Sequence, residues 1–123
     1  MAIHTDLPIY QVSYDLMGLA VDLIKNMPRN ARPIVGDKLR DVCLEVFACI
    51  QEANIAEDKE PHLLGIVKRL DTVNVLLRVS RDKRLISTGQ YASAVELTGT
   101  IGRQATGWRK AASSPASHQA RLI

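Results

Sequence analysis

Residues 37–54 read DKLRDVCLEVFACIQEAN, and this stretch decides the fold class. Its apolar side chains recur every three or four residues, the spacing that places them on one face of an α-helix with about 3.6 residues per turn. The acidic Asp37 and Asp41 lie at its start, where the helix dipole favours negative charge. Asp37–Asn54 is therefore predicted to be an amphipathic helix whose core positions are Leu39, Val42, Cys43, Val46, Cys49, Ile50 and Ala53.

Three further segments show the same period, and clusters of helix-breaking residues separate all four. These helices are predicted from about Leu7 to Met27, from Pro61 to Lys83, and from a cap at Ser87 to about Trp108. No segment shows the alternation of a strand. Because short connections make consecutive helices antiparallel neighbours, the chain is predicted to be all-α, an antiparallel four-helix bundle over residues 1–111, with a flexible tail at 112–123.

The composition excludes several classes of protein. The chain has 123 residues, 46% of them apolar, and no apolar run approaches the roughly 18 residues that a membrane span requires. Two cysteines and three scattered histidines (His4, His62 and His118) make neither a disulfide framework nor a metal site. No phosphate loop or nucleophile elbow is present, and no paired carboxylate lies within the apolar faces. We expect a cytoplasmic protein that is not an enzyme and has no cofactor.

Positive charge is concentrated in the second half of the sequence. Residues 1–61 carry 6 Lys and Arg against 10 Asp and Glu, whereas residues 62–123 carry 10 against 3. Clustered cations gain affinity for a polyanion by displacing its condensed counterions, so this half is predicted to bind nucleic acid. The alternative is a solvated helix surface without a partner. The candidate nucleic-acid-binding residues are Lys68, Arg69, Arg78, Arg81, Lys83, Arg84, Arg103, Arg109 and Lys110.

Two of the predicted helices carry more apolar residues than one core can bury. A second apolar stripe on a small helix is typical of a surface that meets a partner, and the simplest partner is another copy of the chain. Scattered surface hydrophobic residues are the alternative. The predicted interface residues of this homo-oligomer are Tyr10, Tyr14, Met17 and Val21 in the first helix, and Leu64, Val75 and Val79 in the third.

Four segments carry a resemblance to a known family: PIYQVSYDLMGLAVDLIKNMPR (8–29), GDKLRDVCLEVFACIQEAN (36–54), LDTVNVLLRVSRDKRLISTGQY (70–91) and IGRQATGWRK (101–110). The chain resembles the accessory variability determinant proteins of diversity-generating retroelements over about residues 7–111. The most telling parts are the LLR of residues 76–78, Gln90 with Tyr91, and Gly107 with Trp108. These proteins are related to four-helix proteins encoded in intervening sequences of ribosomal RNA genes.

The resemblance implies a specific function. It implies a four-helix bundle that assembles as a pentameric ring, binds template RNA and RNA–DNA intermediates, and associates with the element's reverse transcriptase in mutagenic retrohoming. It supplies no catalytic residue, and of the basic positions it carries over only Arg78. Two alternatives stay open: a protein of the ribosomal-RNA intervening-sequence type without a polymerase partner, and a helical protein-interaction module without RNA binding.

Overall fold

The computed structural model describes residues 7–113 and contains four long helices. Helix α1 spans Pro8–Asn26, α2 spans Asp37–Ile55, α3 spans Glu60–Asp82 and α4 spans Thr88–Ala112. Each boundary lies within a few residues of the predicted one, except that α4 continues to Ala112. The flexible tail predicted from residue 112 falls mainly on 114–123, outside the described residues.

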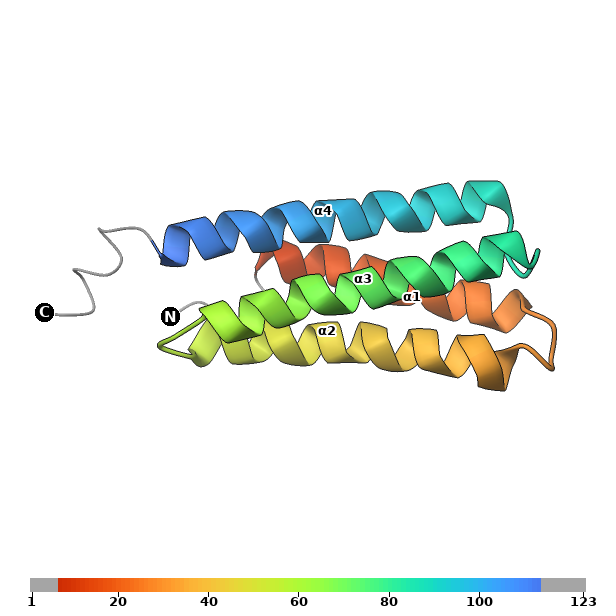
Figure 1. Ribbon diagram of the computed structural model, residues 1–123, viewed down its shortest axis with the longest axis horizontal. Coiled ribbons are helices and arrows are strands. Elements are labelled where there is room, and N and C mark those ends of the chain that lie inside the picture. The colour runs from red at the N-terminus through yellow and green to blue at the C-terminus, as the bar shows by residue number, and fades with distance from the viewer. Residues whose placement is uncertain (1–6, 114–123) are drawn as a thin grey trace, which may run out of the picture.

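The four helices run antiparallel along one long axis (Figure 1). Helix α2 packs between α1 and α3, and α4 packs between α3 and α1, so that α1 and α3 lie diagonally across the bundle. The predicted four-helix bundle is confirmed. All seven predicted core positions of α2 are buried. On the other helices, several apolar residues pack against the edge of the core and are only partly buried: Val12, Leu19, Val67, Tyr91, Leu97 and Trp108.

The connection between α1 and α2 is more ordered than its proline content suggests. Residues Arg32–Gly36 form one turn of π-helix, η2, which continues directly into α2. The helical backbone therefore starts before Asp37, which is the acidic residue in the first turn of α2, as predicted. Arg32 donates hydrogen bonds to the carbonyl oxygens of Lys25 and Met27, at 2.9 and 3.1 Å, and so satisfies the end of α1.

A lysine closes the end of α2. The Lys59 ammonium donates to the carbonyl oxygens of Ala53, Asn54 and Ala56, at 2.7, 3.3 and 3.0 Å. The last carbonyls of an α-helix receive no hydrogen bond from its own amides, and a cation at this end also meets the negative pole of the helix dipole. A single side chain thus fixes the tight connection from α2 to α3.

The turn from α3 to α4 combines two capping motifs. The amide of Leu85 donates to the carbonyl of Ser80 and that of Arg84 to Arg81, the hydrogen-bond pattern of a Schellman motif. Arg84 therefore adopts a positive φ of 59°, where glycine is usual. The predicted Ser87 cap is confirmed: its hydroxyl accepts from the Gln90 amide, and the Gln90 side chain accepts from the Ser87 amide, a capping box.

Candidate nucleic-acid interface

A groove of about 560 Å³ runs between α3 and α4. Its α4 side consists mainly of glycine and threonine, so little side-chain volume stands between a ligand and the helix backbone. Arg103 and Lys110, seven residues apart and both exposed, line the groove, and Val67 lines it from α3. No acidic residue is among the lining residues, which are Val67, Gly99, Gly102, Arg103, Thr106, Gly107 and Lys110. A phosphate backbone can therefore approach without meeting negative charge in the groove.

Six of the nine predicted cations have no ion pair within residues 7–113. They are Lys68, Arg78, Lys83, Arg84, Arg103 and Lys110, and all six are exposed. Arg103 donates to the hydroxyl of Thr100 at 3.1 Å, which holds its guanidinium on the outer surface of α4. These residues lie on α3, on α4 and in the turn between them. The structure thus gives one continuous half of the bundle a surplus of accessible cations.

The other three cations are engaged by carboxylates, although residues 62–123 carry only 3 acidic residues. Arg69 lies 3.9 Å from Glu45 of α2, and Arg109 donates several hydrogen bonds to Glu60 at the start of α3. Both acids belong to the acidic first half of the sequence, and folding places each of them beside a cation of the second half. Hydrogen bonding to Arg109 lowers the pKa of Glu60 and raises the pKa of Arg109.

Arg81 is the third paired cation. Its guanidinium binds Asp82 at 3.0 Å and lies over the Tyr91 ring, 4.3 Å from the ring centre. A stacked arginine that already has a carboxylate partner holds the start of α4 against the end of α3. This contact gives Tyr91 a structural role, and it removes Arg81 from the accessible cations.

The predicted interface residues fall into two separate surfaces. Tyr10, Tyr14 and Met17 of α1 line a groove of about 360 Å³ together with α2 residues, and Tyr10 packs edge-on against Phe47 at 5.2 Å between ring centres. Val75 and Val79 are exposed on α3, which lies diagonally opposite α1. Tyr14 and Val75 are the most exposed of the seven, at 62% and 61%, whereas Tyr10, Met17 and Leu64 are half-buried.

Sequence reasoning missed the contribution of α2 to the first of these surfaces. Leu44 is 50% exposed and Ile55 is also exposed, and Leu44, Phe47 and Gln51 complete the groove beside α1. The spacing of positions 44, 47, 51 and 55 is itself helical, so the signal was present as a second stripe on α2. The sequence analysis identified only the first apolar stripe of α2, whose residues all lie in the core.

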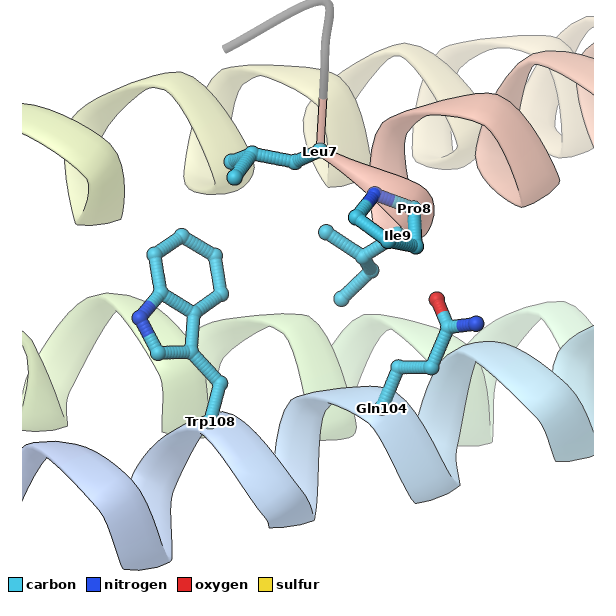
Figure 2. A pocket seen from close by; sticks show the side chains of 5 residues that line it. All are labelled: Leu7, Pro8, Ile9, Gln104 and Trp108. Carbon is cyan, nitrogen blue, oxygen red and sulfur yellow. The ribbon is translucent and has the colours of Figure 1, made fainter. Parts of the chain in front are cut away.

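A smaller apolar pocket of about 290 Å³ lies between α1 and α4 near the end of the bundle. Figure 2 shows Trp108 and Gln104 of α4 facing Leu7, Pro8 and Ile9 across it. The Gln104 side-chain oxygen is buried and accepts no hydrogen bond from the described residues. The pocket gives Trp108 a packing role at this end of the bundle.

The cysteines and histidines form no reactive or metal-binding site within residues 7–113. Cys43 and Cys49 are free and buried in α2, as predicted for packing residues. Burial raises the pKa of the Cys43 thiol to about 11 and also raises that of Cys49, which disfavours the nucleophilic thiolate. The imidazole Nδ1 of His62 lies 3.1 Å from the Glu52 carboxylate, and His4 and His118 lie outside the described residues.

A family model described as bAvd-like matches residues 7–112, which is nearly all of the described chain. The chain belongs to the bAvd-like family. The resemblance to accessory variability determinant proteins is thereby confirmed. Among curated proteins, none matches the chain. In this bAvd-like chain, the telling residues Gln90, Tyr91 and Trp108 cap or pack the helices, whereas Arg78 is exposed. None of the described helices has the length and apolar content needed to cross a membrane.

Proposed function

We propose that this bAvd-like chain is a non-catalytic accessory protein of a diversity-generating retroelement. It acts in the cytoplasm, binds template RNA and RNA–DNA intermediates, and associates with the element's reverse transcriptase to support mutagenic cDNA synthesis and retrohoming. The polymerase performs the chemistry, and the accessory chain requires no cofactor. Membership of the bAvd-like family supports this role.

The observation that carries RNA binding is the groove between α3 and α4. It has two exposed cations, Arg103 and Lys110, and no lining carboxylate, and the neighbouring α3 surface adds Lys68 and Arg78. Contacts to phosphates position a nucleic acid without reading its bases. The groove has no aromatic lining on which bases could stack, so we expect recognition of backbone and shape with weak sequence preference.

Self-association strengthens such a surface. A homo-oligomer repeats the groove in every copy, so that weak phosphate contacts combine into higher avidity. The pentameric ring follows from the family resemblance, and the exposed apolar residues on α1, α2 and α3 supply surface for contacts between copies.

The polymerase meets a different part of the bundle in this proposal. Asp37, Asp41 and Glu45 lie on α2, a helix that does not line the α3–α4 groove, and Glu45 reaches toward Arg69 of α3. Acidic side chains suit contact with a basic protein. RNA and polymerase then occupy separate surfaces, so each interaction can be abolished without the other.

The decisive experiment measures RNA affinity against salt for two matched variants. Arg103→Glu/Lys110→Glu reverses both groove cations, and Lys25→Glu/Arg29→Glu makes the same change in net charge on α1 and the loop after it, away from the groove. We expect the groove variant to bind a structured RNA much more weakly. Its slope of log affinity against log salt should also fall by about 0.7 to 0.9 for each phosphate that is no longer bound. Equal affinity of the two variants would contradict the groove as the RNA site.

The same variants separate the alternatives. A chain that binds no RNA at low salt is a helical protein-interaction module, which the apolar groove between α1 and α2 would suit. A chain that binds RNA through Arg103 and Lys110, but whose gene has no neighbouring reverse transcriptase, is of the ribosomal-RNA intervening-sequence type. Co-purification of the polymerase with a groove variant that no longer binds RNA would support the division between the two surfaces.

A further inference from the structure

The apolar pocket between the start of α1 and the end of α4 plays no part in the proposed function. It measures about 290 Å³, whereas packed interiors contain few voids larger than a water molecule, which occupies about 30 Å³. Leu7, Pro8 and Ile9 form its α1 wall, and Gln104 and Trp108 form its α4 wall (Figure 2). Because the walls are almost entirely apolar, water in this space finds few hydrogen-bond partners. The pocket therefore suits a ligand with apolar faces.

One polar atom of this pocket lacks a partner. The Gln104 side-chain oxygen is buried, points toward α1, and accepts no hydrogen bond from the part of the chain that the structure describes. Pro8, which faces it, carries no amide hydrogen that could donate. Because a side-chain amide turns easily about its last torsion, this oxygen can meet an N–H group that a ligand brings in. A buried acceptor without a donor is costly, so a ligand with an N–H group at its edge is favoured here.

Trp108 sets the shape of the ligand. Its side chain packs against the edge of the core but is only partly buried, and its indole ring is the one aromatic surface among the lining residues. A nucleobase is flat, stacks on aromatic side chains and carries hydrogen-bonding groups on its edges. It therefore fits both the indole of Trp108 and the unpartnered oxygen of Gln104. An aliphatic side chain of a partner protein would fill the space but would bring no donor to Gln104.

The pocket adjoins the α3–α4 groove across the width of α4. Arg103, which lines the groove, directly precedes Gln104, and Gly107, which also lines the groove, directly precedes Trp108. Successive residues of a helix point about 100° apart, so the groove and the pocket lie on neighbouring sides of α4. A Cβ atom at Gly107 would meet nothing within 4 Å, so the helix surface between the two sites is open. A strand whose phosphates contact Arg103 has to cross only α4 to place one base in the pocket.

We propose that this pocket holds one unstacked base from a single-stranded segment of an RNA whose phosphates lie in the α3–α4 groove. The base stacks on Trp108 and donates a hydrogen bond to the Gln104 oxygen. Every base has a π-face on which to stack, so this contact adds affinity with little sequence preference. The inference rests on the proposed function in taking the groove to be an RNA site, and it adds a contact to a base where the groove offers contacts to phosphates.

The chain has one tryptophan, so its tryptophan fluorescence reports on this pocket alone. The probes are two single-stranded RNAs of equal length, an oligouridylate and an abasic ribose-phosphate strand, which differ in bases but not in phosphate charge. We expect the oligouridylate to quench Trp108 fluorescence in the parent chain. The abasic strand should bind about 5- to 150-fold more weakly and leave the fluorescence unchanged. Quenching by the abasic strand, or equal affinity for the two strands, would overturn the base pocket.

Variants of Trp108 assign the contact to its ring. Trp108→Leu keeps an apolar side chain but removes the ring, so its affinity for the oligouridylate should fall to that for the abasic strand, and its affinity for the abasic strand should match the parent's. Trp108→Phe keeps a ring and should retain most of the base-dependent affinity. Circular dichroism and thermal unfolding check that both variants fold. Parent-like affinity of Trp108→Leu for the oligouridylate would contradict the proposal.

Gln104→Leu is a second variant, which removes the acceptor and keeps the ring. It should weaken binding of the oligouridylate and leave binding of the abasic strand unchanged. Gln51→Leu makes the same change on α2, away from the pocket, and should alter neither affinity. Equal effects of these two substitutions on oligouridylate binding would rule out the hydrogen bond to Gln104.

The outcomes separate this inference from the function on which it rests. A parent chain that binds neither strand, or an Arg103→Glu/Lys110→Glu variant that binds RNA as well as its matched control, contradicts the RNA site itself and the base pocket with it. A parent chain that binds both strands alike through Arg103 and Lys110, without quenching, leaves the groove in place and overturns the base pocket alone.

Discussion

The guanidinium of Arg109, near the end of α4, binds the carboxylate of Glu60, the first residue of α3, with Nε to Oε1 at 3.1 Å. The two residues are 49 positions apart in the sequence and meet because α4 returns antiparallel to α3. The ion pair holds the end of α4 against the start of α3. It also engages a cation that the sequence alone would assign to the nucleic-acid-binding set.

The pair predicts a pH-dependent contribution to stability. The pKa of Glu60 is lowered in the folded chain by its hydrogen bond to Arg109, so its stabilising effect is present above the unfolded-state pKa and is lost as the pH falls through the folded-state value. Glu60→Gln should therefore unfold at a lower temperature than the parent at pH 7. The difference should shrink as the pH falls below the ordinary glutamate pKa of about 4.3 and vanish below the lowered folded-state value. Thermal unfolding at both pH values measures it. A difference that persists at low pH would show that the charge of Glu60 is not responsible.

Arg84 has the left-handed conformation of a Schellman motif, with φ of 59°. A side chain in this region costs about 1 kcal/mol compared with glycine. Arg84→Gly should therefore raise the free energy of unfolding by about 0.5 to 1 kcal/mol, in spite of the greater freedom of glycine in the unfolded chain. Chemical denaturation measures this value. Arg84→Ala, which also removes the charge but keeps the Cβ atom, is the control and should bring no such gain.

Ser13 is a polar residue in the core, and its hydroxyl is buried without a hydrogen-bond partner among the described residues. Burying an unsatisfied hydroxyl costs about 1 to 3 kcal/mol, and alanine fills nearly the same space without that cost. Ser13→Ala should raise the unfolding free energy by about 1 kcal/mol. Ser80→Ala is the contrasting change, because the Ser80 hydroxyl donates to the Leu76 carbonyl at 2.7 Å and its removal should bring no gain. Destabilisation by Ser13→Ala would indicate that its hydroxyl has a partner in solution.

Leu70 and Val75 lie on the same helix but should respond differently to truncation. Leu70 is buried in the core, so Leu70→Ala should lower the unfolding free energy by about 2 to 5 kcal/mol. Val75 is exposed, and Val75→Ala should leave the stability of a single copy nearly unchanged, because alanine also favours the helix. Denaturation at low protein concentration, where copies are dissociated, makes the comparison. Equal losses would show that Val75 is buried within its own chain.

The sequence by itself determined the helices and their caps, because these depend on contacts between residues no more than about four positions apart. The period of residues 37–54 identified every buried position of α2, and Ser87 marked the start of α4. The π-helical turn after Ala31 escaped prediction. The hydrogen bonds of this turn include one from the amide of Gly36 to the Ala31 carbonyl. They form in spite of the helix-breaking tendency of two nearby prolines, which is the only signal that the sequence shows here.

The tertiary structure alone decided which charges and which apolar stripes belong together. Glu45 and Glu60 pair with Arg69 and Arg109 because antiparallel packing brings together residues that are far apart in sequence, which no count of charges along the chain can show. The second apolar stripes on α1 and α3 show the same helical spacing in the sequence. Because α1 and α3 lie diagonally across the bundle, however, the two stripes lie on different faces of it. Periodicity fixes the direction of a side chain only relative to its own helix axis. Its partner depends on how the helices are arranged around the core.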